Sequence, residues 1–558
     1  MRLQYDEKSR LLRVIDPFGR EISFSYDARD RVTAIVDPMG NAYRYSYAPY
    51  ASADRGRLIS VTYPDSRSKT YHYNEPEHTS GADLPHALTG ITDENGDRYA
   101  TYQYQADGKA ISTGHAGGAD LHTLAYNPDG TTNVTDPLGT QRTHTFTTVL
   151  GVVKSTGQSQ PGGSGCGPAS SATTYDANGN VASRADFNGN KTCYVYDLTR
   201  NLETARVEGF AAGSACPSDL ANYAPAAGTA ERKILTQWDS RFRLPVKITE
   251  ASRETTTVYD TRGNATSYSI KDTALNQTRT WTTSYIYHPT VPGVLSQKTE
   301  DGPRTDVADL TTTDYYAPDE NCLGGHKGCR GQVRQITNAL GHVTQITRYA
   351  AHGQPVEIID PNGLVTELKY DARQRLVQRS VRSEITQYDY DGVGQLKLVV
   401  LPSSALVRYD YDAAHRLTDI WDRDNNHIHY TLDAMGNRIQ EDIFDANDAP
   451  VATRNRVFDA LNRLWQDIGA VNAATTYLGW VKQVDWSHQR GFYENGFTLA
   501  LSNNSPGATI LYSLDGSPPS LAYTKGLNIN HTVAVRAQAI RPGYKPARIH
   551  TRTFLFLN

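Results

Sequence analysis

The chain has 558 residues, with 56 basic and 60 acidic side chains, a net charge of −4 and a pI near 6.5. Its interspersed charges form no basic patch of the kind that nucleic-acid-binding proteins carry, and no run of about 18 apolar residues predicts a membrane-spanning helix. With 35 Tyr against 12 Phe and 3 Met, and a mean hydropathy of −0.56, the composition favours an all-β protein with much wetted surface.

The beginning of the chain repeats itself every 21 residues. Tyr5, Tyr26 and Tyr47 are 21 residues apart, and the first two begin Tyr-Asp dipeptides. An Arg-Leu or Arg-Val pair follows each dipeptide, and an Asp-Pro-x-Gly turn follows that pair. A fixed period of this length predicts a stacked repeat architecture.

One repeat reads as a β-hairpin. Residues 10–15 (RLLRVI) have the composition of a strand, and residues 21–26 alternate apolar and polar side chains. Between them, Asp16, Pro17 and Gly19 occupy positions i, i+1 and i+3 of a predicted type I turn. Because one hairpin is marginally stable in water, we expect neighbouring units to join into a continuous sheet.

The period continues to residue 472, interrupted by insertions, of which 158–171, rich in Gly, Ser and Pro, is expected to be an exposed loop. Two further insertions are predicted at 216–228 and 318–331. The repeat is clearest after residue 349, and period arithmetic gives roughly 22 units. The residues assigned a structural role in the repeat are Tyr5, Asp6, Asp16, Pro17, Gly19, Tyr26, Asp27, Tyr370, Asp371, Tyr411 and Asp412.

The recurring Asp residues allow two interpretations. They are suitable as calcium ligands or as acid/base pairs, but an Asp side chain in a turn commonly bonds the backbone two residues on. Because they recur in every unit, turn chemistry is the favoured interpretation. The Tyr rows also allow two: rings packed on one another between neighbouring strands, or an aromatic face that holds sugars.

These repeats resemble the YD repeats of the Rhs family, also found in insecticidal toxin-complex subunits and teneurins, over about 85% of the chain. The stretch from Leu88 to Gly139, including His115-Ala116-Gly117-Gly118, is similar to large bacterial Rhs proteins. The resemblance implies a spiralling array of hairpins, either a hollow shell around a toxin or passenger or an open curved sheet. Family members usually end with a core segment that carries an autoproteolytic Asp and then a toxin. No such segment is recognisable after Asn472, so self-cleavage and toxicity are not expected here.

After a predicted linker at 473–486, residues 487–558 lose the period. Short alternating stretches at 497–502, 508–514, 532–539 and 551–557 predict a small β-sandwich. This segment resembles the immunoglobulin-like C-terminal domain of chitobiase and β-hexosaminidase, which implies a non-catalytic accessory module. The residues that carry the resemblance are Tyr512, Asp515, Gly516, Ser517 and Pro519.

The five cysteines define no disulfide framework by their number. Cys322 and Cys329 are a candidate local disulfide, and with His326 they offer three metal ligands, but the spacing is not that of a standard zinc site. Cys166, Cys193 and Cys216 lie in or near predicted loops, and their pairing stays open. His427 and His429 share one face of a predicted strand, where two imidazoles without a third ligand favour an ordinary sheet role.

No Gly-rich phosphate loop and no Gly-x-Ser-x-Gly elbow occurs, so we expect no enzyme, no catalytic residues, no metal and no cofactor. The predicted role is structural, in encapsulation, cell contact or adhesion, with a toxin or passenger polypeptide as partner. The alternatives are a surface protein that binds polysaccharide and a toxin-delivery component that lacks its toxin. An extracellular or cell-surface location is expected, although the N-terminus has no apolar signal core.

Overall fold

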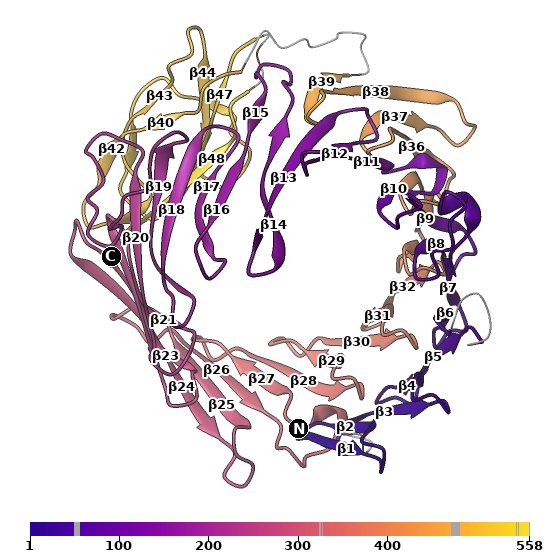
Figure 1. Ribbon diagram of the computed structural model, residues 1–558. Helices are drawn as coiled ribbons and strands as arrows, with labels where there is room; N and C mark the ends of the chain where they lie inside the picture. Colours follow the sequence, from indigo (N-terminus) through magenta and orange to yellow (C-terminus); the bar gives the residue numbers. More distant parts are fainter. Residues whose placement is uncertain are drawn as a thin grey trace. The chain divides into compact units, whose positions relative to one another are not determined.

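The computed structural model describes residues 1–49, 56–322, 325, 327–469, 480–542, 544 and 546–556. The described chain is nearly all β, with short 3₁₀ turns at η1 (Pro76–His78), η2 (Ala116–Gly118) and η3 (Lys327–Cys329) (Figure 1). None of its helices has the length and apolar character needed to cross a membrane. The predicted all-β array of hairpins followed by a small sandwich is confirmed.

The first sheet has 15 antiparallel strands that pair in chain order. Its strands are β1 (Arg2–Tyr5), β2 (Leu11–Ile15), β3 (Glu21–Tyr26), β4 (Val32–Val36), β5 (Ala42–Tyr47), β6 (Leu58–Thr62), β7 (Ser68–Tyr73), β8 (Leu88–Thr92), β9 (Arg98–Tyr104), β10 (Ala110–His115), β11 (His122–Tyr126), β12 (Thr132–Thr135), β13 (Gln141–Val149), β14 (Val152–Gln160) and β15 (Ala169–Ser170).

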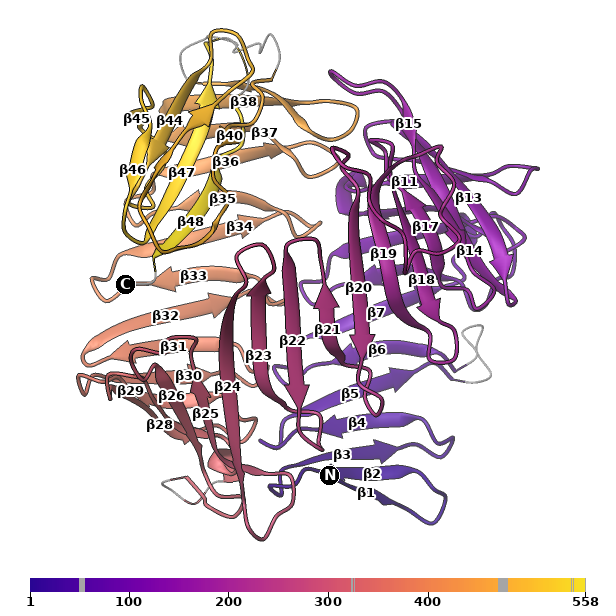
Figure 2. The ribbon, with the colours of Figure 1, turned by 90° about the vertical axis from the view of Figure 1, so that its left-hand side faces the viewer.

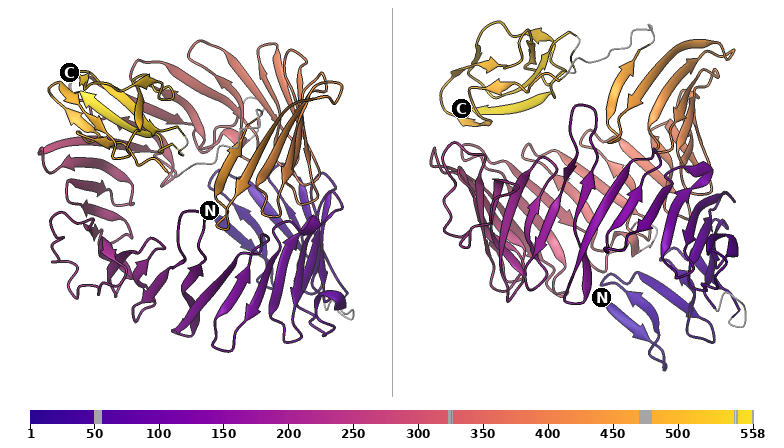
Figure 3. Two further views of the ribbon diagram at one scale, coloured as in Figure 1. Left: turned by 90° about the horizontal axis from the view of Figure 1, so that it is seen from above. Right: turned by 45° about the horizontal axis from the view of Figure 1, so that its top comes forward.

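The next strands also follow chain order, and Figure 2 shows the longer ones, such as β22, β23 and β24, running side by side. Figure 3 gives two further views of the strands. They are β16 (Ala172–Tyr175), β17 (Val181–Ala185), β18 (Asn190–Asp197), β19 (Leu202–Ala211), β20 (Arg232–Trp238), β21 (Pro245–Thr249), β22 (Arg253–Tyr259), β23 (Ala265–Asp272), β24 (Gln277–Tyr287), β25 (Leu295–Asp301), β26 (Leu310–Tyr315), β27 (Val333–Thr337), β28 (Val343–Tyr349), β29 (Pro355–Ile359), β30 (Val365–Tyr370), β31 (Leu376–Val381), β32 (Glu384–Tyr390), β33 (Leu396–Val400), β34 (Leu406–Tyr411), β35 (Leu417–Trp421), β36 (His427–Leu432), β37 (Arg438–Phe444), β38 (Pro450–Phe458) and β39 (Leu464–Ile468).

Within the described part of residues 1–472 the structure thus has strands β1 to β39, fewer than roughly 22 hairpins would need. Insertions and long strands use part of the chain: residues 212–231 separate β19 from β20, and β24 alone has 11 residues. The predicted loop at 158–171 is partly wrong, because β14 runs to Gln160 and Ser159 pairs with Ser170 of β15. Residues 158–160 alternate Gln and Ser, and residues 159 and 160 pair with β15 as an extension of the strand.

The chain forms two compact units. The first comprises residues 1–161, 168–437 and 443–449, and the second comprises 162–167, 438–442 and 450–558. The strand pair β38–β39 therefore falls in the second unit, although the repeat pattern extends through it.

The C-terminal module contains β40 (Asp485–Trp486), β41 (Gly491–Tyr493), β42 (Phe497–Leu499), β43 (Leu501–Ser502), β44 (Thr509–Ser513), β45 (Leu521–Ala522), β46 (Leu527–Ile529), β47 (Val533–Ile540) and β48 (His550–Phe556). Its main sheet has the order β41-β48-β47-β44-β45, and β44, β47 and β48 lie side by side in Figure 2. In β47 every second residue is buried, from Val533 to Ala539, so this face covers the core around Leu499 and Phe554.

The module begins earlier than the sequence predicts. Val481 and Val484 are buried in its core, and β40 pairs with β43. Residues 480–486, which the sequence assigned to the linker, are therefore part of the folded module. The segment is too short to show a hydrophobic period, so its two core valines could not be recognised from the sequence. The rest of the predicted linker, 473–479, lies outside the described residues.

Candidate functional site: the repeat unit and the seam of turns

Many of the hairpin turns are organised by one aspartate carboxylate. Asp16 Oδ1 accepts hydrogen bonds from the backbone N–H groups of Phe18 (2.8 Å) and Arg20 (2.9 Å), and Asp16 Oδ2 accepts one from Arg20 Nε (2.6 Å). Gly19 closes the turn at a φ of 80°, which glycine adopts without steric cost. Asp27 makes the same three contacts with Arg29 and Arg31.

The other repeat aspartates have the same partners at the same spacing. Asp6, Asp371 and Asp412 each accept hydrogen bonds from the backbone N–H groups two and four residues further along the chain. The backbone N–H of Arg10, followed by its side chain, holds the pKa of Asp6 below its usual range, and Arg31 does the same for Asp27. These carboxylates are thus occupied within their own turns.

Each of these repeat tyrosines connects the two strands of its own hairpin. The hydroxyl of Tyr26 donates to the carbonyl of Leu11 (2.7 Å), and Tyr47 donates to Val32 (2.8 Å). Tyr370 and Tyr411 donate in the same way to Pro355 and Leu396 (2.9 and 3.0 Å).

The rings of Tyr26 and Tyr47 pack on arginine cations. Arg10 lies 5.0 Å from the centroid of the Tyr26 ring, and Arg31 lies 4.4 Å from that of Tyr47. Consecutive repeat tyrosines are two strands apart, a distance of about 9.5 Å, so their rings cannot touch. The arginine of the intervening turn fills this gap and gains a cation–π contact. Sequence reasoning missed this role, although the constant offset between Arg and the next Tyr was the available signal.

Tyr26→Phe is expected to destabilise the array by about 1 kcal/mol, because it leaves the Leu11 carbonyl without its hydroxyl donor while keeping the ring. Urea denaturation monitored by circular dichroism measures the change. Tyr5→Phe is the matched control, since its side chain is 55% exposed and its hydroxyl has no hydrogen bond within the described chain. Equal effects of the two substitutions would contradict the assigned role.

Hairpin turns far apart in the sequence meet along a line that we call the seam. The turns that follow β2, β4, β6 and β8, together with Asp120, contact η3 and the turns that follow β28, β30, β32, β34 and β36. In each seam hydrogen bond that involves a side chain, the two partners are 296 to 322 residues apart in the sequence. Both sets of turns run in the same chain direction, so the chain returns along its own earlier turns.

The seam begins at η3 and continues with a histidine. Lys327 Nζ and Arg330 Nη1 donate to the carbonyls of Gly19 (3.2 Å) and Phe18 (3.3 Å). His352 Nε2 then lies 2.7 Å from Asp37 Oδ2, and both side chains are 9% exposed. Burial alone would raise the pKa of Asp37, but hydrogen bonds from His352 and Asn41 outweigh it and hold this pKa below its usual range.

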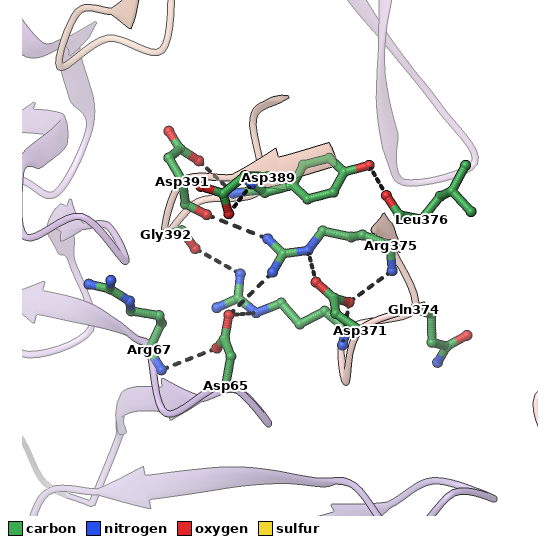
Figure 4. Close-up of polar contacts among 12 residues, drawn as sticks. Asp65, Arg67, Asp371, Gln374, Arg375, Leu376, Asp389, Asp391 and Gly392 are labelled. Carbon is green, nitrogen blue, oxygen red and sulfur yellow. Dashed lines mark hydrogen bonds and ion pairs between the residues drawn. The ribbon is translucent and has the colours of Figure 1, made fainter. Parts of the chain in front are cut away.

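The middle of the seam is a pair of arginines on one carboxylate. Arg373 Nε lies 2.9 Å from Asp65 Oδ2 and Arg375 Nη2 lies 3.5 Å from the same oxygen. Figure 4 shows Asp65 reaching from its turn toward the turn that carries Asp371 and Arg375. Arg373 also covers the ring of Tyr63 at 4.1 Å, and burial, followed by the charge of Glu94, raises the pKa of Tyr63 to about 12.

The next seam contacts involve the turn after β8. Asn95 Oδ1 accepts from the backbone N–H of Gly392 (2.9 Å), and Asn95 Nδ2 donates to Asp391 (3.2 Å). His415 Nε2 lies 2.7 Å from Asp93 Oδ2, and the side chain of Asp93 is fully buried. Beyond them, the backbone N–H of Asp120 donates to the carbonyl of Ala434 (2.7 Å).

Beside the seam, Glu75 joins η1 to β8 and β9. Arg98 passes over Gly90, where a Cβ would lie 1.9 Å from its guanidinium, and donates to Glu75 at 2.6 and 3.0 Å. Thr89 Oγ1 donates to the same carboxylate (2.6 Å). The hydrogen bond from Arg98 is the largest cause of a Glu75 pKa lowered to about 2.

The array is therefore expected to lose stability in acid partly through Glu75. Because its folded-state pKa is below the ordinary value of 4.5, its contribution is complete above pH 4.5 and is lost as the pH falls toward about 2. Unfolding midpoints measured between pH 6 and pH 2.5 are expected to fall less steeply in Glu75→Gln than in the natural chain. Parallel curves for the two proteins would contradict this assignment.

The predicted cysteine and histidine sites are structural. Cys322 and Cys329 form a disulfide (S–S 2.05 Å), so their sulfurs are not free to bind a metal, and His326 lies outside the described residues. Cys193 pairs with Cys216, which ties insertion 212–231 over the buried side chains of β18 and β19, and Cys166 is free and exposed. No cluster of three metal-ligating side chains occurs within the described ranges.

His427 and His429 lie on β36, where they make separate contacts. His427 is stacked between Trp421 (3.9 Å) and Phe444 (4.6 Å). His429 Nδ1 lies 2.8 Å from Asp419 Oδ1 on β35.

The C-terminal motif forms a turn. Asp515 Oδ1 accepts from the backbone N–H of Ser517 (3.0 Å), and Gly516, with a φ of 80°, accepts from Arg536 (2.7 Å). Tyr512 lies in β44 and Pro519 is buried.

Comparisons with known proteins agree with this architecture. Family models match the RHS repeat at residues 5–42, 349–383 and 390–420, and the chitobiase/beta-hexosaminidase C-terminal domain at 488–551. Among curated proteins, none has a sequence that matches the chain significantly.

Solved structures with the same fold are Tc toxin assemblies. The crystal structure of TcdB2-TccC3-TEV has a TM-score of 0.50 and 12% identity, over 99% of this chain and 30% of that one. The Photorhabdus luminescens Tc holotoxin pore gives 0.51 and 13%, over 97% and 30%. The chain thus spans about a third of the length of these structures, and at such identity the likeness establishes the fold alone.

Proposed function

We propose that this chain, which carries RHS repeats and a C-terminal module of the chitobiase type, is a structural, non-catalytic part of a β shell that encloses a polypeptide passenger. The seam is the observation that carries the proposal. A sheet that only extended away from its start would not return to its own turns, whereas here contacts recur at separations near 310 residues. A wall wound in this way needs such contacts between successive passes, because unsupported passes would part and admit solvent.

The fold shared with Tc toxin assemblies supports a role in toxin delivery, with this chain supplying wall and another polypeptide supplying the passenger. The two disulfides favour an exported, extracellular or surface location, since disulfides persist in oxidising compartments. The turn aspartates and repeat tyrosines are engaged in turns and carbonyl contacts, which favours a structural role over catalysis.

Small-angle X-ray scattering tests the shell directly. For the natural chain we expect the pair-distance distribution of a hollow particle. In a second experiment a reporter polypeptide is fused after Asn558, and we expect the shell to enclose it and protect it from protease. A profile of an extended solid, with the reporter cleaved as fast as free reporter, would overturn the proposal. A seam variant such as Asp65→Ala is the control, because it is expected to open the wall while leaving each hairpin intact.

A polysaccharide-binding surface protein that acts in adhesion is the second candidate. The observation that favours it is a hollow of about 590 Å³ lined by the hydroxyl and amide side chains of Thr101, Gln103, Ser112 and Thr123. Glycan-array binding that Gln103→Leu abolishes would support this role. Complete absence of binding by the full chain would reject it.

A further inference from the structure

Two of the seam contacts differ in chemistry from the rest. Each joins an imidazole to a carboxylate at 2.7 Å: His352 to Asp37, and His415 to Asp93. The Arg373–Asp65 contact between them is an ion pair whose arginine keeps its charge at all ordinary pH values. Histidine is the side chain whose charge ordinarily changes between about pH 5 and 8. We propose that the seam is a pH-dependent latch, closed by charged His352 and His415 and loosened when the two imidazoles lose their protons.

The rings beside His415 hold it at the contact. His415 has a φ of 63°, in the left-handed region, at the turn position that Gly19 and Gly40 occupy in other repeats and that Asp30 and Gln374 occupy with a similar φ. A non-glycine residue there costs on the order of 1 kcal/mol and persists where surrounding contacts hold it. Here its ring stacks on Tyr99 at 4.1 Å, and Tyr99 stacks in turn on His115 at 4.5 Å.

The cations around His352 are engaged with partners other than Asp37. The charged and titratable groups that face this contact or line the hollow beside it are Asp37, Tyr43, Arg20, Arg348, Tyr349, Lys369, Tyr370, Asp371 and Arg373. Among the cations, Arg20 is paired with Asp16 (2.6 Å), Arg348 with Glu357 (2.8 Å) and Arg373 with Asp65 (2.9 Å), and Lys369 Nζ donates to Gln378 Oε1 (3.4 Å). The carboxylate of Asp37 therefore receives its positive partner from His352.

The surroundings of His415 are less charged. The groups that face it are Asp93, Tyr99, His115, Asp120 and Asp412. Asp412 is occupied by Arg416 (2.7 Å). Because the Asp93 side chain is fully buried, its ion pair with His415 is little screened by salt.

The sign follows from the two charges. When the imidazole carries its proton and the carboxylate is ionised, each contact is a charge-assisted hydrogen bond, roughly twice as strong as a neutral one. When the imidazole loses that proton this gain is lost, while the arginine contact in the middle remains. The seam is thus expected to open first at its two histidine turns, whether or not the array encloses a passenger.

Hydrogen exchange followed by mass spectrometry tests the latch on the full chain. After correction for intrinsic exchange rates, protection of turns 350–353 and 412–415 is expected to fall on the order of tenfold between pH 6 and pH 8.5. In the double variant His352→Gln/His415→Gln it is expected to be low and equal at both pH values. Turn 371–374, held by the arginine pair, is the internal reference and is expected to change little.

His429→Gln is the matched control, because His429 makes an imidazole–carboxylate contact of 2.8 Å with Asp419 on an adjacent strand, away from the seam. It is expected to keep the natural pH dependence of both seam turns. If the double variant fails to fold, the single variants decide, since each is expected to flatten the response of its own turn only. Equal protection of the natural seam at both pH values, or a pH response that survives removal of both histidines, would overturn the proposal.

Discussion

Asp93→Ala is expected to lower the free energy of unfolding of the array by about 3 kcal/mol. The fully buried carboxylate accepts hydrogen bonds from the backbone of Asn95 (2.9 Å) and Asp97 (3.0 Å) and contacts His415 Nε2 (2.7 Å). Its removal leaves two backbone donors and a half-buried imidazole without their acceptor. Urea denaturation monitored by circular dichroism gives the change, and hydrogen exchange of residues 412–415 shows whether the seam opens.

Asp422→Ala is the control for this prediction. Asp422 makes the same bonds within its turn, with the backbone of Asp424 and Asn426 at 2.9 Å each, but its side chain is exposed. A much smaller cost is expected, with no change in exchange at residues 412–415. If the two substitutions cost the same, the seam contributes nothing beyond local turn chemistry.

Phe554→Ala is expected to unfold the C-terminal module, with a loss of about 3 to 5 kcal/mol. Phe554 is fully buried in β48 and contacts the rings of Phe497 (5.3 Å between centroids) and Tyr493 (5.8 Å). A module of this size has little stability to spare, so a cavity of this volume exceeds what it can tolerate.

Thermal unfolding followed by near-ultraviolet circular dichroism measures this loss, and limited proteolysis within residues 480–556 locates it. Ile549→Ala, at a side chain that is 38% exposed, is the control and is expected to be nearly neutral. A Phe554→Ala chain whose C-terminal module stays protease-resistant would contradict the placement of this core.

Much of the fold is local and was predictable for that reason. The turn that Asp16 organises is complete within five residues, because its carboxylate bonds the backbone of Phe18 and Arg20. The alternation in β47 lies within eight residues and fixes which face covers the core of the module. The start of that module was harder to predict, because Val481 and Val484 become core residues only through strands that follow them.

In the candidate site, too, the local features were predictable from the sequence and the contacts between distant residues were not. The sequence assigned the repeat Asp and Tyr residues to structure, but it predicted ring-on-ring packing and missed the arginine that packs on Tyr47, since that contact depends on the strand inserted between neighbouring tyrosines. It also left the pairing of Cys193 with Cys216 open, because that bond depends on how insertion 212–231 folds back.

By itself, the sequence determined the repeating hairpin from Tyr5 onward, because each hairpin is specified by turn residues and alternation within about 21 positions. Only the tertiary structure decided which turns meet. His352 reaches Asp37 across 315 residues, and His415 reaches Asp93 across 322. Those separations follow from the twist accumulated over many strands and from the lengths of the insertions between them, and no local pattern encodes that sum.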